Sequence, residues 1–182
     1  MDELSLYILD IAMNSLRAGA SEISLTITED DEAVCFCIKD NGCGMSKDQT
    51  EKLFSPFYTT RTSRNVGLGL PLLKMLAEMT GGRVKINSVP EKACGKHGTT
   101  VIAEFGKKHL DSLPLGDITE TVIAIIQNSP GVNFTFVHKN PCGEIRFSTK
   151  EIKTVLGDIS ISEPKILMWI EEYLREQYNA AG

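Results

Sequence analysis

The sequence predicts an α+β fold: a two-layer α/β sandwich with helices on one face of a mixed, mainly antiparallel sheet. Two observations support this prediction. Short stretches alternate apolar and polar residues as strands do, and longer stretches repeat apolar residues every three to four positions as helices do. A helical layer on one side of a sheet buries both apolar faces economically. Strands are expected at 22–28, 33–39, 83–89 and 99–105, and helices at 3–18, 46–54 and 71–80.

The first helix, residues 3–18, carries two stripes of different character. Its apolar stripe consists of Leu6, Leu9, Met13 and Leu16. Asp10, Asn14 and Arg17 fall at i, i+4 and i+7, so they share a separate polar stripe. The amide oxygen of Asn14 can bind Mg2+ and the carboxylate of Asp10 can orient or deprotonate a water. A solvated helix face would show the same pattern.

The second predicted strand ends at a carboxylate that is followed by glycines. A charged turn over residues 29–32 joins strands 22–28 and 33–39, and Asp40-Asn41-Gly42-Cys43-Gly44-Met45 comes next. A carboxylate in this place can accept a hydrogen bond from an exocyclic amine such as the adenine N6, and glycines let the backbone approach a flat base. Asp, Asn and Gly are also the commonest turn residues, so a plain turn is the competing interpretation.

A second glycine-rich turn precedes the helix at 71–80. Gly67-Leu68-Gly69-Leu70 leads directly into Pro71, which suits the start of a helix because its missing N–H costs nothing there. A glycine turn that opens a helix is a natural cradle for phosphates. Gly-x-Gly ahead of a helix also recurs by chance, so the turn alone predicts little.

Beyond residue 107 the pattern changes, and the chain is expected to divide into 1–107 and a small α+β appendage at 111–182. Elements are expected at 117–128 (helix), 132–138 and 144–147 (hairpin strands), 149–156 (helix), and a last helix capped by Ser162. The appendage is expected to serve protein contact, including homodimerisation. Met168, Trp169 and Tyr173 form either a docking surface or part of the core.

Composition is that of a globular protein, with 42% hydrophobic and 24% charged residues among 182. The net charge of -5 argues against a nucleic-acid partner, as do ten acidic against six basic residues in 111–182. No apolar run approaches a membrane span, and the first residues lack the basic start of a signal peptide. A cytoplasmic location is therefore expected, with the five cysteines reduced.

Four elements occur in a fixed order: Asp10…Asn14, Asp40-x-Gly42-x-Gly44, Gly67-x-Gly69 and Gly98-Thr99. This order resembles the N, G1, G2 and G3 boxes of the GHKL superfamily, the Bergerat-fold ATPases, over roughly residues 1–107. Residues 14–20 are similar to the mismatch-repair branch. Residues 53–61 together with 67–70 look like the catalytic domain of histidine kinases.

The resemblance implies ATP and Mg2+ as ligands. Asn14 would hold Mg2+, Asp40 the adenine, and Asp10 a water. Arg61, in a short lid, would either pair with phosphate oxygens or remain a solvated loop charge. The ATP-binding residues implied by the motifs are Asn14, Asp40, Gly42, Gly44, Met45, Arg61, Gly67, Leu68, Gly69, Leu70 and Thr99.

Three functions remain open at this point. Only nine residues precede Asp10, so the phospho-acceptor hairpin of histidine kinases is expected to be missing. A regulatory kinase-like subunit acting in trans on an unidentified protein is then favoured, similar to the stand-alone serine kinases of anti-sigma systems. An ATP hydrolase or ATP-gated switch is the second reading, although those branches carry Glu where this chain has Asp10. A sensor that binds ATP or ADP without turnover is the third.

Overall fold

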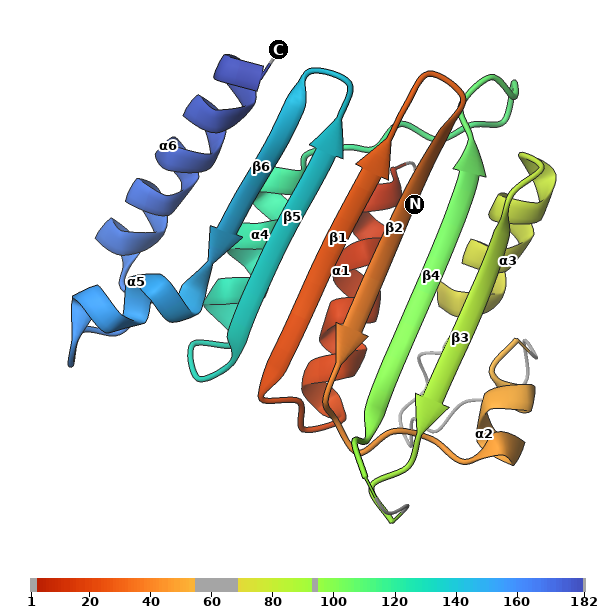
Figure 1. Ribbon diagram of the computed structural model, residues 1–182, viewed down its shortest axis with the longest axis horizontal. Helices are drawn as coiled ribbons and strands as arrows, with labels where there is room; N and C mark the ends of the chain where they lie inside the picture. Colours follow the sequence, from red (N-terminus) through yellow and green to blue (C-terminus); the bar gives the residue numbers. More distant parts are fainter. Residues whose placement is uncertain (1–2, 55–68, 93–94, 182) are drawn as a thin grey trace.

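The computed structural model describes residues 3–54, 69–92 and 95–181, which form one six-stranded sheet with helices on one face (Figure 1). The strand order is β3-β4-β2-β1-β5-β6. β5 runs parallel to β1, and the other neighbouring pairs are antiparallel. The expected α+β architecture is confirmed. The strands are β1 Glu22–Glu29, β2 Ala33–Asp40, β3 Arg83–Val89, β4 Gly98–Gly106, β5 Asn133–Asn140 and β6 Gly143–Ser148.

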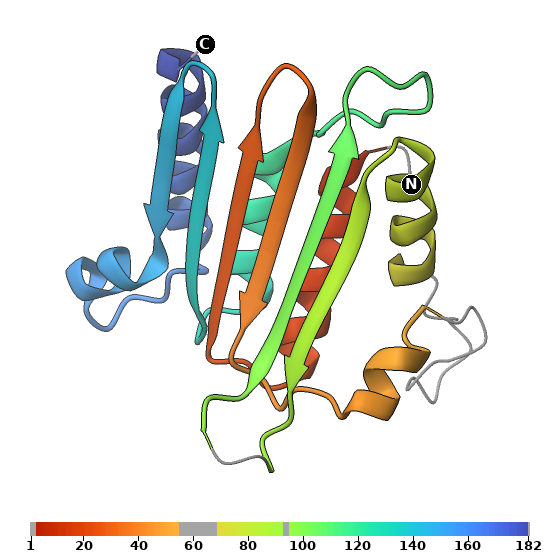
Figure 2. The ribbon, with the colours of Figure 1, turned by 45° about the vertical axis from the view of Figure 1, so that its right-hand side comes forward.

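The helices α1, α3, α4 and α6 lie on the same side of the sheet (Figures 1 and 2). Their bounds agree with the sequence prediction to within about two residues at most ends, as is usual for helix ends. The helices are α1 Leu4–Arg17, α2 Lys47–Lys52, α3 Gly69–Met79, α4 Ile118–Asn128, α5 Thr149–Leu156 and α6 Pro164–Ala181.

Alternation along the strands places the core between the sheet and these helices. In β2, Val34, Phe36 and Ile38 are buried while the residues between them are partly exposed. Phe36 stacks on Phe105 of β4 at 6.1 Å between ring centroids. The same cluster continues under β5, so one hydrophobic core runs the full width of the sheet.

The C-terminal stretch is joined to the first helix as well as to the sheet. α1 has no side-chain cap at its N-terminus. Instead, the N–H groups of Leu4 and Ser5 donate to the carbonyls of Pro114 and Leu115 at 3.0 and 2.9 Å. One sheet and one core are therefore shared by the stretches 1–107 and 111–182. That the two stretches fold as separate domains stays a prediction.

The two predicted serine caps have different outcomes. Ser46 caps α2 in a capping box, because its hydroxyl accepts from the Gln49 N–H and its own N–H donates to the Gln49 side chain. The Ser162 prediction is wrong, since α6 begins at Pro164 and the carbonyl of Glu163 accepts the first helical hydrogen bonds. The Ser162 hydroxyl instead bonds the hydroxyl of Ser160.

Candidate functional site

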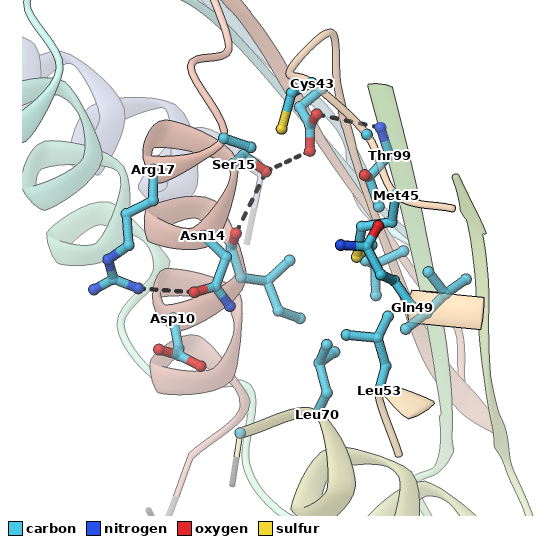
Figure 3. Close-up of a pocket in the computed structure, with 17 residues that line it drawn as sticks. Asp10, Asn14, Ser15, Arg17, Cys43, Met45, Gln49, Leu53, Leu70 and Thr99 are labelled. Atoms are coloured by element: carbon cyan, nitrogen blue, oxygen red, sulfur yellow. Dashed lines mark hydrogen bonds between the residues drawn. The ribbon is translucent and has the colours of Figure 1, made fainter. Parts of the chain in front are cut away.

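A pocket of about 350 Å³ opens between α1 and the end of β2. Its walls come from one polar face of α1, the loop after β2, the helix α2, the start of α3 and strand β4 (Figure 3). This volume falls within the range of small-molecule sites. The pocket therefore gathers elements that are far apart in the sequence around one space of ligand size.

The carboxylate of Asp40 is fixed at the base of this pocket by three hydrogen bonds. Its Oδ2 accepts from the Ser15 hydroxyl at 2.7 Å, and its Oδ1 accepts from the backbone N–H groups of Gly42 and Thr99 at 2.9 and 3.2 Å. Asp40 is only 8% exposed and still lines the pocket. Because a carboxylate oxygen has two lone-pair directions, Oδ2 keeps capacity for one further donor.

The two glycines after Asp40 are required by close backbone packing. A Cβ on Gly42 would lie 2.8 Å from the Ala18 Cβ, so this loop presses against the end of α1. Gly44 has φ +63°, and a Cβ there would lie 1.9 Å from the Val89 carbonyl oxygen. His97 also contacts the loop, with its Nδ1 2.7 Å from the Gly42 oxygen. The loop is thus held in one conformation beside the pocket.

The polar face of α1 forms the opposite wall. Asp10, Asn14 and Arg17 all line the pocket, and the Arg17 Nη1 donates to the Asn14 Oδ1 at 2.7 Å (Figure 3). A Cβ on Gly69 would lie 2.3 Å from the Asp10 Oδ2, so this carboxylate stands against the start of α3. The first helix and the second glycine motif, predicted separately, therefore meet at one end of the pocket.

A small hydroxyl network supports the wall formed by β4. The Ser88 hydroxyl lies 2.9 Å from the Thr99 hydroxyl and accepts a hydrogen bond from the Met45 N–H at 2.8 Å. Leu53 and Ile86 add apolar surface to the pocket. A planar ring can therefore pack on an apolar wall while its polar edge reaches Asp40.

Most predicted site residues come together, although three cannot be placed. Arg61, Gly67 and Leu68 lie outside the described residues. Gly42 contributes its N–H to Asp40. The remaining predicted residues line the pocket: Asp10, Asn14, Asp40, Gly44, Met45, Gly69, Leu70 and Thr99.

Sequence reasoning missed several lining residues, among them Ser15, Gln49 and Leu53. Gln49 could have been found from Ser46-x-x-Gln49, which marks a helix start beside the glycine loop. Ser15 gave no such indication, because only the rotation of α1 over the sheet shows which face meets Asp40. Arg17 was placed on the polar stripe without a role.

In residues 3–54, 69–92 and 95–181, no group of three or more His, Cys, Asp or Glu residues is placed to hold a metal ion. Across the same ranges, no helix has both the length and the apolar character needed to cross a membrane.

The family model of histidine kinase-, DNA gyrase B- and HSP90-like ATPases matches residues 2–109. The sensor histidine kinase ZraS of Escherichia coli O157:H7 is 31% identical over 93 residues, which is 50% of this chain and 20% of ZraS. The sensor protein SrrB of Staphylococcus aureus (strain NCTC 8325 / PS 47) is 32% identical over 112 residues, 59% of this chain and 18% of SrrB. The chain thus spans about a fifth of the length of these relatives.

Solved structures show a wider similarity of fold. The N-terminal domain of a DNA repair protein matches with a TM-score of 0.61 and 18% identity, over 87% of this chain and 58% of that one. The Aquifex aeolicus MutL ATPase domain complexed with ADP matches with a TM-score of 0.57 and 16% identity, over 86% and 69%. At these identities the likeness establishes the fold alone. With the motifs, the pocket and the family model in agreement, this chain belongs to the histidine kinase-, DNA gyrase B- and HSP90-like ATPase family.

Proposed function

We propose that this ATP-binding, histidine kinase-like domain binds ATP with Mg2+ and passes the γ-phosphoryl group to a residue on another protein. The observation that carries the proposal is the buried Asp40 carboxylate, which keeps one acceptor position toward the pocket. The adenine N6 amine is a donor that fits this position, whereas guanine has the acceptor O6. Binding is therefore expected to favour ATP over GTP.

The opposite end of the pocket suits the phosphates. Gly69 stands at the start of α3, where backbone N–H groups and the helix dipole favour an anion. Arg17 adds a guanidinium at the pocket wall. In the proposed complex, Arg17 leaves the Asn14 amide oxygen for a phosphate oxygen, because Arg17 and Mg2+ on the same oxygen would repel each other.

Oxygen donors on this wall fit Mg2+, which binds nucleotides through one or two protein groups, the phosphates and water. Asn14 would supply the protein ligand through its amide oxygen, and Asp10 would orient a metal-bound water. The metal would neutralise charge on the phosphates as the γ-phosphoryl group is transferred. The residues of this chain position the nucleotide, and the acceptor comes from the partner.

Transfer in trans is supported by where the three histidines lie. His97 contacts the Gly42 oxygen in a loop, His109 lies in the loop after β4, and His138 is buried at 2% exposure in β5. None of these positions resembles an exposed acceptor on a helix. These positions favour an acceptor that lies outside these 182 residues.

A second candidate function is ATP hydrolysis, favoured by the position of Asp10. Its carboxylate stands against Gly69, at the end of the pocket where the phosphates would lie. An aspartate there could act as the base for an attacking water. Its side chain is one methylene shorter than the glutamate of the hydrolytic branches, and a misplacement of about 1 Å can cost roughly a hundredfold in rate.

Incubation of the purified chain with γ-labelled ATP and Mg2+ tests these alternatives. We expect little label on the chain itself and slow phosphate release, with Asp40→Asn as the background control. A stable phosphohistidine on this chain would contradict transfer in trans. Rapid phosphate release that Asp10→Asn abolishes would instead establish the hydrolase.

A further inference from the structure

A second pocket lies between α5 and α6, outside the nucleotide site. It also measures about 350 Å³ and is lined almost entirely by apolar side chains. The α5–α6 groove, as we call it, is formed by Glu151, Ile152, Val155, Leu156, Ile166 and Trp169. α5 and α6 stand at the β6 end of the sheet, whereas α2 and α3 stand at the β3 end (Figure 1).

Large apolar side chains are exposed in and around this groove. Val155 is 87% exposed and Trp169 is 53% exposed, although both line it. Met168, next to Trp169 in α6, is 61% exposed, and Ile159, in the loop after α5, is 56% exposed. Single exposed apolar residues are normal on a protein surface, but exposed apolar side chains that line one groove, as Val155 and Trp169 do, mark an interaction site.

The groove has the length and volume needed for a short helix. α5 is eight residues long, about 12 Å, so the groove accommodates roughly two helical turns. A cavity of about 150 Å³ holds a benzene ring, so this one has room for about two large side chains. Trp169 stacks on Tyr173 at 5.9 Å and 19°, which gives the groove a rigid aromatic wall. An amphipathic helix presents such side chains at i and i+3 or i+4.

Charge at the rim decides which kind of partner fits. Glu151 lines the groove, and Glu172 and Glu176 are exposed three and seven positions after Trp169, on the same side of α6. Lys165, four positions before Trp169, is the basic residue of this stripe. A second copy of the chain would bring the same acidic rim, whereas a partner with basic flanks would meet opposite charge.

We propose that the α5–α6 groove binds an amphipathic helix of a partner protein that has bulky apolar residues on one face and Lys or Arg beside them. The groove lies between α5 and α6 and the nucleotide pocket between α1, α2, α3, β2 and β4, with no lining residue in common, so both sites can be filled together. As the docking site for the protein acted on in trans, this inference rests on the proposed function. The binding of a helix to the groove can itself be tested in the absence of nucleotide.

Trp169 is the only tryptophan in the chain, so its fluorescence reports on the groove directly. The probe is a tryptophan-free synthetic 14-residue amphipathic helix with Leu on one face and Lys on the other. Its matched control carries Glu in place of each Lys. We expect the Lys peptide to shift Trp169 emission to the blue and saturate, with at least about tenfold weaker binding of the Glu peptide and a loss of affinity at high salt.

Three variants locate the binding. Val155→Ser is expected to weaken the Lys peptide roughly five- to tenfold, because it removes an exposed apolar contact. Leu110→Ser, at a side chain that is 97% exposed and lies outside the groove, is the matched control and should leave binding unchanged. Replacing both Glu172 and Glu176 with Lys should reduce the difference in affinity between the Lys peptide and the Glu peptide.

The proposal is overturned if neither peptide shifts the emission, if both bind equally, or if Val155→Ser has no more effect than Leu110→Ser. It is also overturned if sedimentation shows that two copies already associate through this face without peptide. Calorimetry with ATP on the same preparation separates the two proposals. Peptide binding with no ATP binding would refute the nucleotide site alone, and the reverse result would refute the groove alone.

Discussion

Two buried ionisable side chains on the same sheet, Asp40 and His138, differ in the hydrogen-bonding capacity that the fold leaves open. Asp40 ends β2 and is 8% exposed, whereas His138 lies in β5 and is 2% exposed. Each is held by hydrogen bonds from separate parts of the chain. Only Asp40 also lines a pocket and keeps an acceptor position after its protein partners are counted.

Both ring nitrogens of His138 lie within hydrogen-bonding distance of another side chain. Its Nδ1 lies 2.8 Å from the Tyr178 hydroxyl and its Nε2 lies 3.1 Å from the Glu29 Oε1. Burial lowers the pKa of His138, partly offset by Glu29, and burial also raises the pKa of Tyr178. The contact between His138 and Tyr178 connects β5 with α6. The difference shows that burial alone does not mark a candidate ligand site, because only Asp40 combines burial with spare hydrogen-bonding capacity beside a pocket.

The largest effect should come from the glycine loop on the Asp40 side. Gly44→Ala would place a Cβ 1.9 Å from the Val89 oxygen, so we expect about 4 kcal/mol of destabilisation and loss of ATP binding. Gly81→Ala is the matched control, because Gly81 also has positive φ, +77°, with no atom within 4 Å of the added Cβ. It should cost about 1 kcal/mol and leave ATP binding intact. Chemical denaturation with calorimetry would measure both, and equal effects would contradict the packing argument.

For the buried histidine, in contrast, we expect His138→Ala to lower the stability of the fold without changing ligand binding. It leaves a cavity, removes the Tyr178 hydrogen bond and leaves Glu29 with Lys107 alone, so about 3 kcal/mol of unfolding free energy should be lost. The ATP dissociation constant of the folded fraction should stay within about twofold, as expected for a distant site. A large change in ATP affinity would show that the two regions are coupled.

Ser15→Ala tests whether the orientation of Asp40 matters for the ligand. The variant removes the 2.7 Å hydrogen bond to Oδ2 and leaves the two backbone donors in place. We expect ATP affinity to fall roughly tenfold with about 1 kcal/mol lost in stability. Ser15→Thr keeps a hydroxyl and should restore most of the affinity, whereas equal binding by Ser15→Ala would remove Ser15 from the site.

The smallest effect is the pH dependence of stability from His138. Its folded pKa lies below the ordinary value of 6.5, so the unfolded chain binds more protons as pH falls. The stabilisation is complete above about pH 6.5 and is lost as pH falls toward the folded pKa, at no more than about 1.4 kcal/mol per pH unit. Glu29, Tyr178 and Lys107 are the charged or titratable groups that act on this ring. Unfolding curves between pH 5 and 7.5 should show the slope, and His138→Gln should flatten it.

Local sequence patterns were enough to predict many of the residues that line the pocket beside Asp40. Asp10 and Asn14 share a helix face through their spacing, and the run from Asp40 to Gly44 predicts a carboxylate beside a glycine turn. The capping box at Ser46 likewise depends on residues three positions apart. Each of these relations is contained within one helix or one turn, where sequence spacing determines geometry.

Relations between distant segments were not predictable in the same way. The parallel pairing of β5 with β1 joins residues more than a hundred positions apart, and strand periodicity does not name a partner. For the same reason the contact of Ser15 with Asp40 and that of His138 with Glu29 required the assembled sheet. The capping of α1 by the carbonyls of Pro114 and Leu115 is a backbone contact that no side-chain pattern indicates.

Calorimetry of ATP binding to the Asp40→Asn variant tests the central claim most directly. The amide keeps the shape of the carboxylate and can still accept from Gly42 and Thr99, but it directs an N–H₂ toward Ser15 and the pocket. We predict at least about a hundredfold loss of ATP affinity in the presence of Mg2+, with His138→Gln binding normally as the control. An Asp40→Asn protein that is folded and binds ATP as tightly as the original chain would contradict the account.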